Sequence, residues 1–138
     1  MQIDTALLCE AATVHDNLFF ILGGGITDVA YSDYPAELRV TLALRILVHP
    51  TEMGRQHHLE ILLQDEDGDQ ITRVNADVQL GDPDQVPPGE LGEMLIPWSF
   101  PAKPQLPNPG RYAFEIVIDG IHQLTIPLRA TGLQEQEE

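Results

Sequence analysis

Apolar and polar residues alternate with a period of two along much of this 138-residue chain. The clearest run covers residues 37–48, where every second side chain from Leu38 to Val48 is apolar. Successive side chains of a β-strand point to opposite faces, so this pattern predicts a strand and excludes an amphipathic helix. We expect one continuous strand over 37–48, with its apolar face in a core.

A second alternating pattern, nearer the C-terminal end, predicts a β-hairpin with Asp119-Gly120 as its turn signal. A two-residue loop would pair Phe114 with Thr125 and place Leu124 on the face opposite Phe114. We therefore predict a three-residue loop over 118–120, in which Gly120 is left-handed and Phe114 faces Leu124.

Shorter apolar runs predict the other strands, separated by clusters of Gly, Pro, Asn and Asp. These strands are expected over 6–14, 18–22 (resuming over 26–31), 57–64, 70–80 and 93–100. About eight strands without a convincing helix predict an all-β fold, an antiparallel β-sandwich of immunoglobulin-like or C2-like form. The expected core consists of Leu38, Val40, Leu42, Leu44, Ile61, Tyr112, Phe114, Ile116, Leu124 and Ile126.

The length is typical of one domain, which we place at 1–133, followed by an acidic disordered tail at 134–138. The chain begins without a basic, apolar leader, and its apolar runs fall short of the ~18 residues that a membrane span needs. The single cysteine, Cys9, lies in an apolar run and is expected to be buried and reduced. We therefore expect a cytoplasmic protein.

The charge balance narrows the choice of partners. The chain has 22 acidic residues against 7 basic ones, a formal net charge of −15. Nucleic acids and anionic membranes are poor partners for such a surface, because like charges repel. A basic protein partner or a cation fits better.

Five short segments stand out along the chain: Leu8-Cys9-Glu10-Ala11-Ala12, Leu22-Gly23-Gly24-Gly25, His58-Leu59-Glu60, Asp65-Glu66-Asp67-Gly68 and Pro109-Gly110-Arg111-Tyr112. With these segments the chain resembles a small uncharacterised bacterial family of single-domain proteins, classed as a domain of unknown function. The resemblance spans most of the chain and implies no activity or site. The last segment also resembles the final hairpin of immunoglobulin-like and fibronectin-like modules, which supports a sandwich.

Residues suited to nucleophilic catalysis are few. Ser32 and Ser99 are the only serines, and neither lies in a Gly-x-Ser-x-Gly turn. Cys9 has no basic neighbour in the sequence to activate its thiol. The run Gly23–Gly25 lacks the spacing of a phosphate-binding loop and is expected to bend the chain. We expect a protein that is not an enzyme and uses no cofactor.

Two groups of residues are candidate metal ligands. His58 and Glu60 share one face of a predicted strand and could both bind a transition metal, although a solvated face with a His–Glu hydrogen bond is the simpler interpretation. His57 points to the other face of that strand, so it cannot join them.

The second group is a calcium hypothesis. Asp65, Asp67 and Asp69 crowd one turn, and carboxylate oxygens are the ligands that calcium prefers. The run does not match the EF-hand loop, but acidic loops of C2-like sandwiches bind calcium together, and the loop at 82–84 could contribute. The competing interpretation is a polar hairpin turn with Gly68 at positive φ.

Self-association is the remaining option. The strand expected at 37–48 carries Ala43 and Leu47 on its second face, which could pair two sandwiches in a symmetric dimer. At a sheet edge, the free backbone groups of this strand would also invite a partner strand. The leading prediction is a non-enzymatic protein-interaction module that self-associates, as a homo-oligomer or with a protein partner. The alternative is a calcium- or carbohydrate-binding β-sandwich that uses its acidic loops. The aromatic candidates for carbohydrate are Trp98, Tyr31 and Tyr34.

Overall fold

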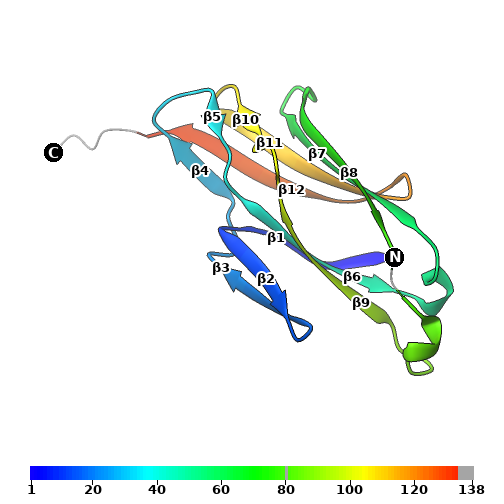
Figure 1. The fold of residues 1–138 in the computed structure, drawn as a ribbon. Helices are drawn as coiled ribbons and strands as arrows, with labels where there is room; N and C mark the ends of the chain where they lie inside the picture. The colour runs from blue at the N-terminus through cyan, green and yellow to red at the C-terminus, as the bar shows by residue number, and fades with distance from the viewer. Residues whose placement is uncertain (80, 134–138) are drawn as a thin grey trace.

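The computed structural model describes residues 1–79 and 81–133, in which two β-sheets face each other across an apolar core (Figure 1). The first sheet has the order β1–β6–β9, formed by Gln2–Cys9, Thr41–Val48 and Gly92–Ser99. The second has the order β4–β12–β11–β7–β8, formed by Asp28–Tyr31, Ile121–Gly132, Gly110–Ile118, His57–Asp65 and Gln70–Val78. Neighbouring strands are antiparallel except β4 and β12, which are parallel. The predicted all-β antiparallel sandwich is confirmed.

Four short strands lie outside these two sheets. β2 (Ala11–His15) and β3 (Leu18–Leu22) form a ribbon of their own, and β5 (Ala36–Glu37) pairs with β10 (Gln105–Leu106). Two 3-10 turns, η1 (Pro50–Glu52) and η2 (Pro83–Gln85), lie in loops. Among the residues described, no helix has the length and apolar character needed to cross a membrane. The acidic tail expected at 134–138 falls outside the described ranges.

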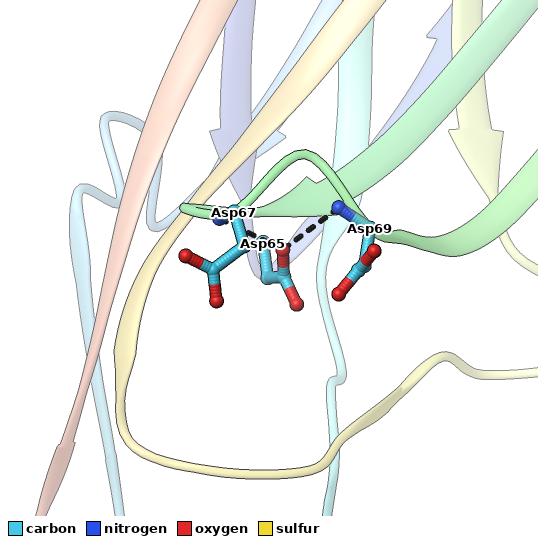
Figure 2. Close-up of side chains that lie close together, drawn as sticks. All are labelled: Asp65, Asp67 and Asp69. Carbon is cyan, nitrogen blue, oxygen red and sulfur yellow. Dashed lines mark hydrogen bonds between the residues drawn. The ribbon is translucent and has the colours of Figure 1, made fainter.

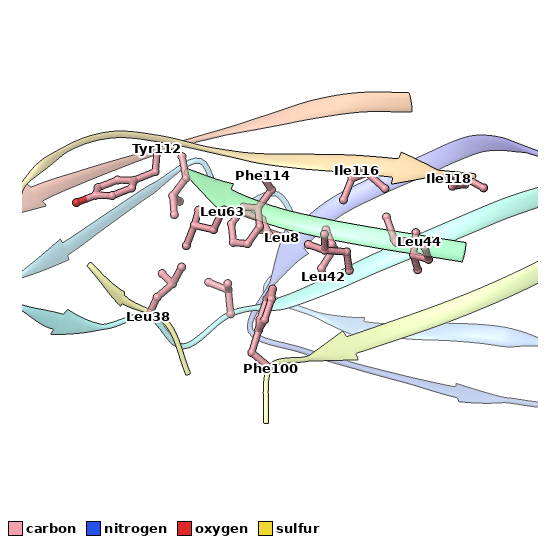
Figure 3. Close-up of a cluster of buried hydrophobic side chains, with 14 of the residues drawn as sticks. Leu8, Leu38, Leu42, Leu44, Leu63, Phe100, Tyr112, Phe114, Ile116 and Ile118 are labelled. Atoms are coloured by element: carbon pink, nitrogen blue, oxygen red, sulfur yellow. The ribbon is translucent and has the colours of Figure 1, made fainter. Parts of the chain in front are cut away.

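The core is built from alternate side chains of the facing strands (Figure 3). The predicted core residues Leu38, Val40, Leu42, Leu44, Ile61, Tyr112, Phe114 and Ile116 are all buried. The other two, Leu124 and Ile126, are half-buried and pack against this core. Both precede the part of β12 that pairs with β4, so β12 has an open side at these positions.

The strand expected at 37–48 differs from the prediction in two ways. It is divided into β5 and β6, with residues 38–40 between them. In addition, β6 lies at the centre of its sheet between β1 and β9, so its backbone groups are already paired. Ala43, on its second face, is fully buried. The hypothesis of self-association through this strand as an edge is therefore wrong.

The strand expected at 6–14 is also divided. β1 ends at Cys9, and after Glu10 the chain continues in the β2–β3 ribbon. The Glu10 amide donates a hydrogen bond to the Leu22 carbonyl at 3.0 Å, which closes the base of the ribbon. Gly23 has φ of 62°, and a Cβ there would lie 2.7 Å from the Glu10 side chain. The glycine run thus bends the chain, as the sequence indicated.

The C-terminal hairpin has a shorter loop than we predicted. Ile118 pairs with Ile121, so the loop is the two residues Asp119-Gly120, with φ of 51° and 77°. The register shifts at a bulge between Ile116 and Val117. As a result Phe114 pairs with Ile126, and neither with Leu124 as predicted nor with Thr125. A bulge within the strands, and not a longer loop, brings the apolar residues to one face.

Candidate functional site

The β2–β3 ribbon ends in a two-residue turn, Asp16-Asn17. Both residues have positive φ, 51° and 59°, a conformation that Asp and Asn tolerate better than other non-glycine residues. Such turns match the twist of the flanking strands, and all five residues of β3 are apolar. The local sequence therefore specifies a hairpin at this point of the chain.

The outer face of this ribbon exposes large apolar side chains to solvent. Leu18, Phe20 and Leu22 are 61%, 55% and 66% exposed. They occupy every second position of β3, so they form one stripe on one face. Seven large apolar side chains are exposed among the described residues, and four of them lie in β3. The exposed apolar surface is therefore concentrated on the ribbon.

Smaller residues of β2 lie beside this apolar stripe. Ala11 is the partner of Leu22, and Thr13 is the partner of Phe20. A shallow groove of about 360 Å³ runs over the ribbon, lined by Ala11, Ala12, Thr13, Phe20, Ile21 and Leu22. At these two pairs the ribbon presents large side chains next to small ones, and near the turn the His15 ring meets Phe20 edge to face, with ring centroids 5.7 Å apart.

The ribbon itself carries little charge. Residues 11–22 contain one acidic residue, Asp16 at the tip, and no lysine or arginine. β2 lies against β6 and β9, and β3 is the strand farther from them (Figure 1). The apolar stripe therefore lies on the side of the ribbon that faces away from the sandwich.

The second candidate site is the turn between β7 and β8. Asp65, Asp67 and Asp69 each offer one oxygen, and these oxygens lie within 4.8 Å of one another (Figure 2). The Asp65 carboxylate accepts hydrogen bonds from the Asp67 and Asp69 amides, at 3.0 and 2.9 Å. Gly68, at φ of 83°, donates its amide to the Asp65 carbonyl. The three aspartates are therefore brought together, and Asp65 also builds the turn.

Asp82 and Asp84, which could have contributed to this site, do not belong to the same group. They lie in the loop around η2, where the Asp82 carboxylate accepts from the Asp84 amide at 2.9 Å. Within the described part of the chain, the candidate calcium ligands are thus the three aspartates of the β7–β8 turn.

His58 and Glu60 lie on the outer face of β7, as their spacing predicted. The His58 ring contacts Asp77 at 3.2 Å, Asn75 at 3.0 Å and Glu60 at 3.6 Å. Arg73 binds the Glu60 carboxylate, and its hydrogen bond lowers the pKa of that group. Hydrogen bonding to Asp77 raises the pKa of His58. These contacts favour the simpler interpretation, a hydrogen-bonded outer face.

His57, the neighbour of His58, takes part in an arrangement that the sequence analysis missed. Its ring is buried, with Nδ1 2.6 Å from Asp119 Oδ2 and Nε2 2.6 Å from the Glu52 carbonyl. Both partners accept hydrogen bonds, so both ring nitrogens must carry protons for both bonds to form. The bond to Asp119 raises the pKa of His57 and lowers that of Asp119. The buried His57 ring thus ties η1 to the hairpin turn.

No sequence signal could have joined these residues, because they are 62 positions apart. They meet because β7 pairs with β11, which places the β11–β12 turn beside the start of β7. Strand order is a non-local property, and alternation within single strands does not report it.

Cys9 and Ser99, two of the residues considered for nucleophilic chemistry, have structural partners. Cys9 is buried, as predicted, and its thiol lies 3.3 Å from the Thr41 carbonyl. Burial raises the pKa of the Cys9 thiol, which keeps it protonated at neutral pH. The Ser99 hydroxyl lies 3.2 Å from that of Thr41.

The three aromatic residues considered for carbohydrate binding are half-buried and pack against the core. Tyr31 and Tyr34 meet edge to face at 6.1 Å, and the Tyr34 hydroxyl donates to the Thr131 carbonyl at 2.7 Å. Trp98 lies on β9 and meets Phe100 at 6.3 Å. These three rings contribute to the edges of the core.

Fold and candidate sites together define a β-sandwich that carries an exposed apolar ribbon. The model of a protein family described as "Family of unknown function (DUF6941)" matches residues 4–131, which include the ribbon and both sheets. The chain belongs to this family. A search of curated proteins found no match.

Proposed function

We propose that this protein is a non-enzymatic protein-interaction module that self-associates, formed by a single domain over 1–133. The observation that carries the proposal is the apolar stripe of β3, which lies outside both sheets and faces solvent. The largest apolar patch on a protein surface is often a binding site, because exposure of apolar side chains to water is unfavourable. A binding partner that covers the stripe removes this cost.

The charge of the chain limits which partners can cover it. A net charge of −15 disfavours nucleic acids and anionic membranes. The ribbon supplies apolar contacts and almost no charge, which suits another protein surface. The free Cys9 thiol suits the reducing conditions of the cytoplasm.

The test is the molecular mass of the purified chain in solution. We expect sedimentation equilibrium and light scattering to show a dimer that dissociates on dilution, as mass action requires. The proposal would be contradicted if the mass stayed that of one chain at every concentration up to about 100 μM, because the dissociation constants of functional dimers are well below this concentration.

A second candidate function is calcium binding by the β7–β8 turn, and the close approach of the three aspartate oxygens favours it. Calcium binds 6–8 oxygens, so water or further groups would complete its shell. For a Kd near ~1 mM, 10 mM calcium would raise the melting temperature by about 4 °C.

Asp67 and Asp69 are the residues to change, since Asp65 builds the turn. The double variant Asp67→Asn/Asp69→Asn should lose the calcium shift, whereas Asp82→Asn, in the other acidic loop, should retain it. Calorimetric titration with calcium chloride measures the same difference directly. An unchanged melting temperature of the original protein in calcium would exclude this candidate.

A further inference from the structure

The ribbon is complementary in shape to itself. On the outer face, Phe20 and Leu22 of β3 stand beside the smaller Thr13 and Ala11 of β2, while His15 lies beside Leu18 near the turn. If a second ribbon is turned over about a two-fold axis parallel to the strands, its β3 lies over β2 of the first. At Ala11 and Thr13 the large side chains of each copy then fill the low positions of the other, and at the turn Leu18 of each copy meets His15 of the other, in an arrangement with the symmetry of a dimer.

We propose that two copies of this chain associate face to face through the β2–β3 ribbon, with Phe20 of each copy packed over Thr13 of the other. The same axis places Leu22 over Ala11. This inference rests on the proposed self-association and assigns its surface and geometry. The groove of about 360 Å³ that Ala11 and Thr13 help to line receives the large side chains of the second copy.

Charge supports a second copy approaching at this surface. Two molecules that each carry −15 repel each other, so they can approach closely only where acidic residues are sparse. The ribbon is such a place, because Asp16 at its tip is the single acid between residues 11 and 22. A strongly basic partner would be drawn to the acidic surfaces elsewhere and would gain little from this one.

The area available fits a reversible dimer. The exposed apolar surface of β3 is on the order of 400 Å² per copy, within the range of the largest patch on an ordinary monomer. Two copies together would bury on the order of 800 Å² of apolar surface, to which the polar rim adds. That total lies below the range of standard specific interfaces and within that of weak, transient complexes, so we expect micromolar rather than nanomolar affinity.

The first experiment compares two lysine substitutions at equally exposed apolar residues. Leu22 and Ile121 are both 66% exposed, but Ile121 lies at the far hairpin turn. Leu22→Lys should raise the dimer Kd by about tenfold or more, whereas Ile121→Lys should change it by less than about threefold. Sedimentation equilibrium measures both, and thermal melting checks that each variant is folded.

The outcomes separate this inference from the proposed function. If the original protein is a single chain at all concentrations, both fail. If it is a dimer that Leu22→Lys leaves intact, self-association stands and the ribbon is not its surface. If Leu22→Lys loses the dimer and Ile121→Lys keeps it, the ribbon is supported as the dimer surface.

The second experiment tests the geometry with variants that each carry one added cysteine. Chains with Phe20→Cys are mixed with chains with Thr13→Cys under mild oxidation, while the buried Cys9 stays protected. The inferred axis predicts a disulfide between the two different chains, formed faster than between two chains with Phe20→Cys. Chains with Ile121→Cys serve as the control. Faster linkage between two Phe20→Cys chains would place β3 over β3 and overturn the inferred axis.

Discussion

Two hairpins of this molecule have the same kind of turn, but one packs its apolar face in the core and the other exposes it to solvent. β2–β3 and β11–β12 both turn through two residues with positive φ, Asp16-Asn17 and Asp119-Gly120. Apolar and polar residues alternate along β12 near its turn, whereas β3 is apolar at all five positions. Yet β11 is central in the five-stranded sheet and its apolar face is buried, whereas β3 exposes its apolar face. Local sequence therefore specifies a hairpin, and the surrounding strands decide whether it is buried.

The connections explain the difference. β11 is flanked by β7 and β12, so its inner face meets the first sheet across the core. The β2–β3 ribbon instead begins after the break at Glu10 and ends at the bend of Gly23–Gly25. The amide of Gly25 donates to the Leu8 carbonyl at 2.9 Å, which fixes the base of the ribbon beside β1. The ribbon therefore lies outside both large sheets, and no other strand of the described chain covers its outer face.

The largest expected effect compares one phenylalanine from each hairpin. Phe114 is fully buried, and Phe114→Ala should lower the free energy of unfolding by about 3–5 kcal/mol because it leaves a cavity. Phe20→Ala should change it by less than about 0.5 kcal/mol in the monomer. Urea denaturation at low protein concentration measures both. Equal losses would show that the ribbon is part of the core.

The next effect concerns the tether at the turn of β11–β12. Asp119→Asn keeps a residue that tolerates positive φ but removes the carboxylate that faces His57. Loss of this charged hydrogen bond to a buried ring should cost about 1–3 kcal/mol near pH 6. Asp16→Asn, in the other turn, is the matched control and should cost less than about 0.5 kcal/mol. Denaturation curves at pH 6 give both values.

The same tether predicts a pH dependence of stability. The pKa of His57 is raised in the folded state, so its contribution is complete below the unfolded value of about 6.5 and is lost as pH rises through the folded value. The pKa of Asp119 is lowered, so its contribution is present above about 3.9 and is lost as pH falls through the folded value. The tether should therefore stabilise most between about pH 4 and 6.5.

Unfolding free energies measured from pH 5 to 9 should fall with rising pH, and His57→Gln should flatten this slope. His58 also has a raised pKa, so His58→Gln is the companion variant that separates the two contributions. A slope unchanged by His57→Gln would mean that the pKa of His57 is the same in the folded and unfolded states.

A smaller effect concerns the base of the ribbon. Gly23→Ala forces a side chain into positive φ and against Glu10, so it should cost about 1–2 kcal/mol. Gly25 has φ of 88° but no atom within 4 Å of its Cβ position, so Gly25→Ala isolates the backbone strain alone. Gly23→Ala should therefore lose more stability than Gly25→Ala, and the double variant Gly23→Ala/Glu10→Ala should regain this extra loss, because it removes the side chain that the new Cβ meets. Thermal melting of the four proteins would show whether this recovery occurs.

The smallest effect is that of salt on the ribbon-mediated dimer. Raising sodium chloride from about 50 to 500 mM screens the repulsion between two acidic molecules and should tighten the dimer about threefold. Folding of the buried hairpin should respond much less, since its contacts are apolar. A dimer that weakens with salt would instead point to contacts between opposite charges.

How much of the fold could be predicted depends on how far apart in the sequence the interacting residues lie. Alternation reports which face of a strand is buried, so the core residues of β6, β7 and β11 were identified correctly. The bulge beside Ile116 was not, because the same alternation is compatible with a longer loop. The central place of β6 was missed for a related reason: an apolar strand has the same pattern at an edge and in the middle of a sheet.

The same distinction between local and non-local interactions applies to the candidate sites. The crowding of Asp65, Asp67 and Asp69 is local and was visible in the sequence. The pairing of His57 with Asp119 depends on strand order and was not. The exposure of Phe20 was missed as well, because a run of five apolar residues resembles a buried strand until its neighbours are known.

The chain enters the ribbon from β1, in the three-stranded sheet, and after the glycine bend continues to β4, in the five-stranded sheet. The ribbon is thus covalently connected to both sheets of the sandwich. A second molecule that binds the ribbon would restrain both sheets at once. Amide protons in β1 and in β4 should therefore exchange more slowly as the protein concentration rises.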